Sequence, residues 1–326
     1  MSHTEISGPG EGPYGVAIAA GEVWTTLVHA GAIVRLNPDA SKHSPAGELG
    51  QCHDLGEPER HDLGGSEQRH DLGGPGQRDA AASPRQRYDL GAPGSRPMVI
   101  TSGADGVWFT RSGDDQIGHI DASGNVSAIA VPGAPYGICV GPDNALWCTL
   151  MSTDEVSRIT VDGEVTTYPI GVAGAFPAVI TAAEDLWFTL NQGNAIGRMT
   201  TAGAVTTYPL PTEGAGPVGI SAGPEAVWFV ELQADQAGRI SADGKIEEFA
   251  LPAGSKPHAV VATPDGGCWI TLWGSGSLVR LDSDGTVVET IELGEGSEPH
   301  GLAVDSDGSV WVALENGSLA HIHAGE

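Results

Sequence analysis

The chain has 326 residues, of which 48 are Gly and 22 are Pro, while only 17% are charged. So many turn-forming residues exclude a helical bundle. The balance of 15 basic and 42 acidic residues gives a formal net charge of −27, which repels phosphate backbones and anionic lipid surfaces. We therefore expect no nucleic acid and no membrane as partners.

The first residues of the chain and its hydropathy show neither a signal peptide nor a membrane-spanning pattern. No apolar run approaches the roughly 20 residues that span a bilayer, and the first ten residues, MSHTEISGPG, lack a basic and then an apolar segment. We expect a soluble, cytoplasmic protein that acts as a monomer.

A tryptophan near the middle of a β-rich run recurs along the chain. The positions are Trp24, Trp108, Trp147, Trp187, Trp228, Trp269 and Trp311. The last five intervals are 39, 40, 41, 41 and 42 residues. Each unit contains four short apolar runs separated by Gly, Asp or Asn turns, which is typical of a four-stranded propeller blade. We expect the tryptophans to pack between blades.

The first interval, from Trp24 to Trp108, is about twice the common period. Residues 50–96 repeat a motif of nine or ten residues, such as HDLGGPGQR, with no tryptophan and almost no β-branched residue. Such a segment buries too little apolar surface to offset its chain entropy. We predict a disordered low-complexity insertion within blade 1, with a decayed eighth blade as the alternative.

The two ends of the chain complement each other. The last unit stops after its third run, SLAHIH at residues 318–323, and HTEIS at residues 3–7 can supply the missing strand. We predict a single all-β domain over residues 1–326. It is a seven-bladed β-propeller of four-stranded blades, in which the N-terminal strand closes the last blade and removes an open edge.

Chemistry is expected where the units differ at equivalent positions. The residues after the proline that opens each innermost strand are Tyr14, Met98, Tyr136, Ala178, Val218, His258 and His300. Glu298 precedes that proline in the last unit. Because residues i and i+2 of an extended chain point to the same side, we expect Glu298 and His300 to share one face.

The fourth residue after each tryptophan gives a second set of positions. These residues are Val28, Ser112, Met151, Asn191, Leu232, Trp273 and Glu315. The first two strands of a blade are antiparallel, so this position lies beside the start of the first strand. Trp273 and Glu315 should therefore meet His258, His300 and Glu298 at one mouth of the central channel. Acids and imidazoles around one cavity favour metal-assisted proton abstraction.

At this point the sequence resembles a known family. The strings GPYG at 12–15, PYGI at 135–138, KPHAV at 256–260, SEPHG at 297–301 and WVALENG at 311–317 are similar to virginiamycin B lyases, also called streptogramin B lyases. The resemblance covers the chain apart from residues 40–96. It implies a seven-bladed propeller that opens type B streptogramins, which are cyclic depsipeptides, at their ester by elimination with Mg²⁺, and so confers antibiotic resistance.

The resemblance also implies roles for individual residues. His258 falls on the family's substrate-contacting histidine, His300 on its general base, and Glu298 and Glu315 on its two metal-binding glutamates. One departure is Leu272, where the family usually has an acid, and this puts the shape of the substrate cleft in question.

The residue types fit that chemistry independently of the family. An ester whose alcohol oxygen is β to a Cα–H can be opened by removing that proton and expelling the carboxylate. Mg²⁺ favours carboxylate ligands, and an imidazole is a base near neutral pH. Tyr14, Tyr136, Phe176 and Trp273 offer walls for an aromatic-rich peptide. The alternatives are a metal-dependent lactonase and a propeller that binds without catalysis.

Overall fold

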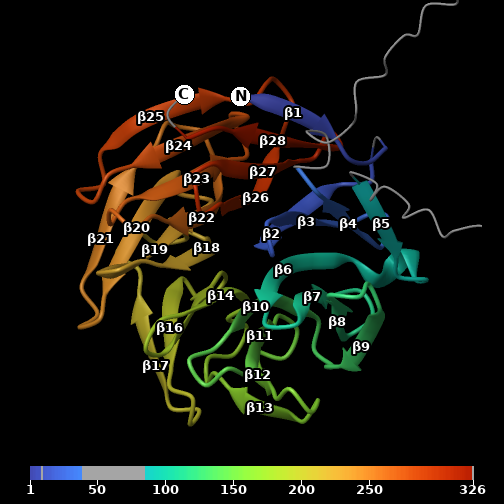
Figure 1. Ribbon diagram of the computed structural model, residues 1–326. Coiled ribbons are helices and arrows are strands. Elements are labelled where there is room, and N and C mark those ends of the chain that lie inside the picture. Colours follow the sequence, from blue (N-terminus) through green and yellow to red (C-terminus); the bar gives the residue numbers. More distant parts are fainter. Residues whose placement is uncertain (9, 39–84, 325–326) are drawn as a thin grey trace, which may run out of the picture.

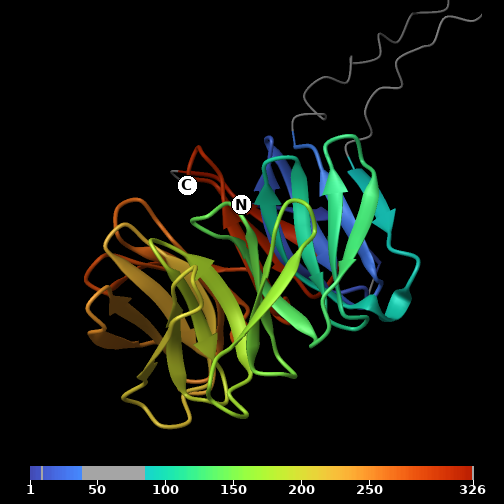
Figure 2. The same ribbon diagram turned by 90° about the horizontal axis from the view of Figure 1, so that it is seen from below.

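Seven four-stranded antiparallel sheets surround a common centre in the computed structural model, which describes residues 1–8, 10–38 and 85–324 (Figure 1). A view turned by 90° shows the same sheets as separate layers around the ring (Figure 2). The described residues contain no α-helix. They therefore include no helix long and apolar enough to cross a membrane. The all-β, seven-bladed architecture predicted from the tryptophan period is confirmed.

The first four blades follow one another along the chain. Blade 1 consists of β2 (Pro13–Ala19), β3 (Glu22–Leu27), β4 (Ala32–Leu36) and β5 (Arg85–Asp89). A 3-10 helix, η2 (Pro93–Ser95), leads into blade 2, which consists of β6 (Pro97–Gly103), β7 (Gly106–Arg111), β8 (Gln116–Asp121) and β9 (Val126–Ala130). Blade 3 consists of β10 (Pro135–Val140), β11 (Leu146–Leu150), β12 (Glu155–Ile159) and β13 (Val165–Pro169). Blade 4 consists of β14 (Pro177–Ala182), β15 (Leu186–Leu190), β16 (Ala195–Met199) and β17 (Val205–Pro209).

The last three blades bring the chain back to its beginning. Blade 5 consists of β18 (Pro217–Ala222), β19 (Ala226–Glu231), β20 (Gln236–Ser241) and β21 (Ile246–Ala250). Blade 6 consists of β22 (Pro257–Ala262), β23 (Cys268–Leu272), β24 (Ser277–Leu281) and β25 (Val287–Glu292). Blade 7 consists of β26 (Pro299–Val304), β27 (Val310–Leu314), β28 (Ser318–Ile322) and β1 (Ser2–Glu5).

The predicted closure by the N-terminal strand is confirmed. Strand β1 pairs antiparallel with β28, with Ser2 opposite His321 and Glu5 opposite Ser318. The two ends of the chain lie side by side at the rim of the ring (Figure 1). This pairing covers the edge that blade 7 would otherwise present to solvent.

The predicted insertion must be shortened at its C-terminal end. Residues 85–96 belong to the propeller, because β5 pairs with β4 over five residue pairs and η2 follows it. Tyr88 anchors this strand by stacking on Trp24, with ring centroids 5.7 Å apart. The remaining part of the predicted insertion, residues 50–84, lies outside the described residues. The sequence pattern does not indicate this outer strand, because four of its five residues are exposed and only Tyr88 is buried.

The repeated tryptophans lie between blades, as predicted. Trp147 of blade 3 packs against Leu186 and Phe188 of blade 4, and Trp311 packs against Val23 of blade 1. In four blades an aromatic ring of the outermost strand also faces the tryptophan; these rings are Tyr88, Tyr168, Tyr208 and Phe249. Buried aromatic contacts of this kind hold the blades together without filling the channel.

One local structure recurs at the start of every innermost strand and positions the site. The residue before the opening proline is left-handed in every blade, as for Lys256 (φ 47°) and Glu298 (φ 44°). Its carbonyl accepts the main-chain N–H of the fourth residue after the tryptophan, for example Trp273 to Lys256 at 3.1 Å. The two positions singled out in the sequence are therefore neighbours at one end of the channel.

Candidate active site

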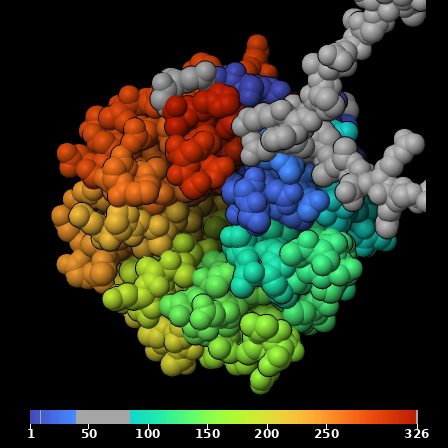
Figure 3. All heavy atoms as spheres, viewed as in Figure 1, coloured from blue at the N-terminus to red at the C-terminus, as the bar shows by residue number. Residues whose placement is uncertain are grey.

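A pocket of about 420 Å³ lies at that end of the channel and contains all six residues assigned to the site from sequence. We call it the mouth pocket. The six residues are Tyr14, His258, Trp273, Glu298, His300 and Glu315. They come from blades 1, 6 and 7, and the surface of the ring is hollowed near its centre (Figure 3).

His300 and Glu315 are in direct polar contact in the mouth pocket. The Nε2 atom of His300 lies 3.0 Å from Oε2 of Glu315. An ionised carboxylate only accepts, so this hydrogen bond requires a proton on Nε2, while Nδ1 is buried with no hydrogen-bond partner among the described residues. The hydrogen bond from His300 holds the pKa of the Glu315 carboxyl below its usual value, which keeps Glu315 ionised.

The backbone around His300 is fixed by the neighbouring blade. Thr271 of β23 donates a hydrogen bond from Oγ1 to the His300 carbonyl at 2.8 Å. The main-chain N–H of Glu315 reaches the carbonyls of Ser297 at 3.0 Å and Glu298 at 3.4 Å. Both ends of the His300–Glu315 pair are thus held by main-chain hydrogen bonds.

His258 closes the floor of the mouth pocket together with two tyrosines. Its Nε2 lies 3.2 Å from the Tyr14 hydroxyl, which in turn is hydrogen-bonded to the Tyr136 hydroxyl. Burial, with a smaller contribution from His300, lowers the pKa of His258 to about 3, so its ring is neutral at physiological pH. The rings of His258 and His300 meet edge to face with centroids 4.9 Å apart.

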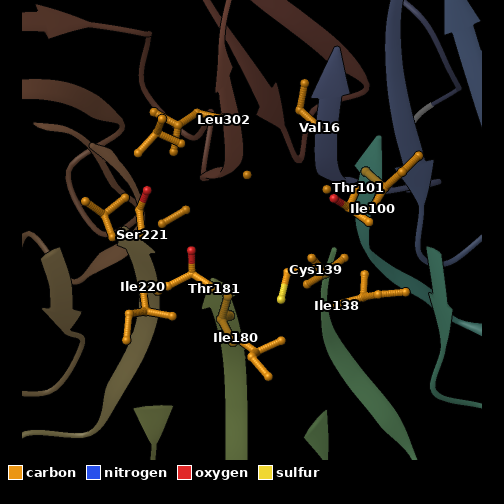
Figure 4. Close-up of a pocket in the computed structure, with 18 of the residues that line it drawn as sticks. Val16, Ile100, Thr101, Ile138, Cys139, Ile180, Thr181, Ile220, Ser221 and Leu302 are labelled. Atoms are coloured by element: carbon orange, nitrogen blue, oxygen red, sulfur yellow. The ribbon is translucent and has the colours of Figure 1, made fainter. Parts of the chain in front are cut away.

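A second cavity lies in the central channel beneath this floor. Its volume is about 300 Å³, and Tyr14 and His258 line both this cavity and the mouth pocket. Its walls are mostly apolar, with Thr101, Cys139, Thr181 and Ser221 turned toward the channel axis (Figure 4). The polar groups expected from the sequence are therefore concentrated at one mouth rather than along the channel.

Glu298 lies at the mouth pocket, but strand alternation is not what brings it there. Alternation along an extended strand was expected to align Glu298 with His300, but Glu298 precedes β26 and has a left-handed backbone. The tight turn, rather than strand alternation, brings this exposed carboxylate into the mouth pocket. Phe176 and Tyr136, which the sequence analysis expects as walls, are not among the described residues that line the mouth pocket, and Tyr136 lines the cavity deeper in the channel instead.

The departure at Leu272 leaves the pocket unaffected. Leu272 is 1% exposed and belongs to the core between blades, so an acid at this position would not line the mouth pocket. Trp273, one residue later, does line it, and its ring lies 5.2 Å from the Lys256 ammonium. This contact places the indole at the blade 6 side of the pocket.

The residues at the mouth fit a Mg²⁺ ion by the chemistry of their donors. Glu298 and Glu315 present carboxylate oxygens from adjacent segments, joined by the main-chain contact between them. The described residues contain no cluster of three or more ligating side chains. One or two carboxylates with several waters is an arrangement that Mg²⁺ commonly takes in proteins.

Comparison with known proteins identifies the family. The model of the virginiamycin B lyase family matches residues 76–322, which include blades 2 to 6, strand β5 of blade 1, strands β26 to β28 of blade 7, and all of the mouth pocket except its blade 1 residues. The chain belongs to the virginiamycin B lyase family. A crystal structure of selenomethionine-substituted virginiamycin B lyase from Staphylococcus aureus is 31% identical, covers 99% of this chain and 98% of that chain, and superposes with a TM-score of 0.82.

Other virginiamycin B lyases support the same assignment. A catalytically inactive histidine-to-alanine variant of the S. aureus virginiamycin B lyase, whose structure was determined with quinupristin, is also 31% identical, with a TM-score of 0.81 and 99% and 98% coverage. Virginiamycin B lyase from Nocardia farcinica is 43% identical over 89 residues, which are 27% of this chain. That match spans 30% of the length of the N. farcinica protein.

Two polar residues of the mouth pocket were missed in the sequence. His29 lies 3.2 Å from the second oxygen of Glu315, and Arg96 lies on the blade 2 side of the pocket. His29 follows the position that was compared between blades, so the repeat did not single it out. Arg96 occupies the same position before the proline as Glu298, but it fell within the predicted insertion.

Proposed function

We propose that this protein linearises type B streptogramins, or closely similar cyclic depsipeptides, by eliminating the ester carboxylate. The observation that carries the proposal is the His300–Glu315 pair, which places a base held by an ionised carboxylate at the mouth of an open, aromatic-walled pocket. Family membership supports the same reaction. The partner of the protein is then a small cyclic peptide.

His300 supplies the base in this reaction. Because Nδ1 is buried, the ring takes up a substrate proton at Nε2, in the tautomer that leaves Nε2 unprotonated, and Glu315 beside Nε2 stabilises the imidazolium that forms. The electrons of the broken Cα–H bond form a carbon–carbon double bond, and the Cβ–O bond breaks toward the carboxylate. Correct placement of the Cα–H bond against His300 accounts for part of the rate enhancement.

His258 and the aromatic rings hold the substrate. Burial keeps His258 neutral, and a neutral imidazole contacts a peptide carbonyl without bringing a second positive charge next to His300. Tyr14 and Trp273 line the same pocket as His258 and offer apolar faces to the substrate. We propose that Glu298 and Glu315 hold Mg²⁺, which when bound makes the α-proton more acidic by withdrawing electron density from the neighbouring carbonyl.

The composition of the pocket favours elimination over nucleophilic opening of the ester. The described residues that line the mouth pocket include no Ser, Thr or Cys that would form an acyl intermediate. A lactonase that uses an activated water is the alternative.

Mass analysis of the product tests the proposal directly. Purified protein is incubated with a type B streptogramin and Mg²⁺ in water enriched in ¹⁸O. Elimination gives a linear peptide with the mass of the cyclic substrate, a new conjugated double bond and no ¹⁸O. A product heavier by one labelled water would assign the protein to the lactonases, and an unchanged substrate would contradict both reactions.

We also propose that the protein acts as a cytoplasmic monomer with no nucleic acid or membrane partner. The net charge of −27 opposes binding to polyanions. With β1 in place every described blade has four strands, so no blade lacks a strand that a second copy would have to supply. A molar mass of one chain by light scattering across concentrations from micromolar upward is the expected result.

A further inference from the structure

Arg96 differs from every other arginine that the structure describes. The guanidinium groups of seven others contact a carboxylate; they are Arg35, Arg87, Arg111, Arg158, Arg198, Arg239 and Arg280. Arg85 donates to the Glu5 carbonyl at 3.3 Å. Arg96 alone among the described arginines has no ion pair or hydrogen bond from its guanidinium, in a protein that has 42 acidic residues.

The unpaired charge of Arg96 lies in the mouth pocket. Its side chain lines the mouth pocket from blade 2, whereas His300 and the two glutamates line it from blade 7. Blade 1 lies between them and contributes Tyr14. The backbone of Arg96 is anchored, because its carbonyl accepts the main-chain N–H of Ser112 at 3.2 Å. The side chain therefore extends into the pocket from a backbone position that is held in place.

The electrostatic reach of Arg96 extends to the floor of the pocket. Burial raises the pKa of Tyr14 and of Tyr136, and the positive charge of Arg96 opposes that rise in both. The second cation at an equivalent position, Lys256, lies over the Trp273 ring and does not line the pocket. Arg96 is thus the one permanently charged cation among the described residues that line the mouth pocket.

We infer that Arg96 is the binding site for the carboxylate that the reaction releases. This inference rests on the proposed function and names the group that recognises the product end of the substrate. The intact ester is uncharged at this position, whereas the departing oxygen takes the electron pair of the broken Cβ–O bond and becomes part of a carboxylate. A guanidinium forms two parallel hydrogen bonds with a carboxylate, so its contribution grows as the bond breaks.

The arrangement separates the two charges that the reaction creates. The proton goes to His300 on the blade 7 side, beside Glu315, and the negative charge develops toward Arg96 on the blade 2 side. Mg²⁺ held by Glu298 and Glu315 would offset their negative charge, whereas the positive charge of Arg96 has no partner among the described residues. The polarity of the pocket therefore determines the orientation of the ester, with its acyl part toward blade 2.

Equilibrium binding tests this inference without requiring turnover. Two probes are compared by calorimetry: the linear dehydropeptide acid that elimination of a type B streptogramin would give, made by synthesis, and its primary amide. The measurements are made with EDTA, so that no divalent cation binds the carboxylate. We expect the wild type to bind the acid roughly tenfold more tightly than the amide, an effect of the size seen for partly exposed charged hydrogen bonds.

Variants assign the preference to one side chain. Arg96→Met should lose the preference for the acid, and Arg96→Lys should retain part of it as a point charge. Lys245→Met removes one positive charge from an exposed hairpin of blade 5 and should behave as wild type. In turnover, Arg96→Met should lower kcat roughly tenfold with little change in KM, because the cyclic ester carries no carboxylate.

The outcomes separate this inference from the proposed function. A wild type that does not distinguish acid from amide, or that binds neither probe, overturns the inference, as does an Arg96→Met variant that keeps the preference. If the wild type prefers the acid through Arg96 but does not open the depsipeptide, the carboxylate site stands and the proposed reaction is wrong.

Discussion

Glu231 occupies a position where five other blades have leucine, and this difference has a measurable consequence. The equivalent residues are Leu27, Leu150, Leu190, Leu272 and Leu314. Glu231 is 0% exposed, and neither of its carboxyl oxygens has a hydrogen-bond partner among the described residues. Burial, together with the nearby Glu248, raises the pKa of Glu231 to about 8. We expect Glu231→Leu to stabilise the protein at alkaline pH.

The sign follows from proton linkage. The unfolded chain loses this proton near pH 4.5, whereas the folded protein keeps it up to about pH 8. Between these values the folded state binds more protons, so rising pH lowers the free energy of unfolding by about 1.4 kcal/mol per unit. Below pH 4.5 both states are protonated and the contribution of Glu231 is fully present. Over three pH units the difference amounts to about 4 kcal/mol.

Thermal unfolding at a series of pH values measures this effect. Relative to wild type, the melting temperature of Glu231→Leu should rise steadily from pH 5 to pH 8, by about 2 °C per kcal/mol, and then level off. Glu225→Gln, on an exposed turn of the same blade, is the matched control and should show no such trend. A constant offset between Glu231→Leu and wild type across this range would refute the reasoning.

Three further predictions concern the active site and the contacts between blades. His300→Ala should reduce turnover about 10²- to 10⁴-fold while circular dichroism and melting stay near wild type, since no blade uses this ring for its core; near-normal turnover would contradict its role as the base. Chelation should abolish turnover reversibly, with Mg²⁺ restoring it and the melting temperature unchanged within a few degrees, and activity that persists in EDTA would exclude the metal. Ile129→Tyr should leave the melting temperature within about 1 °C of wild type, because Tyr168 and Tyr208 stack on their tryptophans from this position but the His119 ring already stacks on Trp108, with centroids 3.9 Å apart; a clear rise would contradict this.

The sequence predicted the fold well because one property is repeated in every blade. Each tryptophan needs a neighbouring blade to bury it, so its period of about 40 residues reports the spacing of blades directly. The predicted C-terminal boundary of the insertion was wrong because β5 buries only Tyr88. An outer strand can pair with its neighbour through main-chain hydrogen bonds without an alternating apolar pattern. Repetition therefore predicts the inner strands better than the rim.

The candidate site was predicted by comparing equivalent positions of the blades, and the residues that this comparison missed show its limits. His258, Trp273 and Glu315 stand out against apolar or small residues at the same place in other blades. His29 does not, because it contacts Glu315 from a different blade, across a space that Gly12 leaves free; a Cβ there would lie 2.6 Å from the His29 ring. Contacts between distant segments of this kind depend on three-dimensional packing and have no signature in the repeat.

The pairing of β1 with β28 also constrains how the chain reaches its native state. Ser2 and His321 are far apart in the sequence, so β1 is synthesised long before the strand with which it pairs. Blades 2 to 6 consist of consecutive segments and can form as the nascent chain emerges. Ring closure is then the contact of highest sequence separation, and it should be the slowest step of folding. The proposed base His300 and its partner Glu315 lie in that last blade, so the candidate active site is complete only after closure.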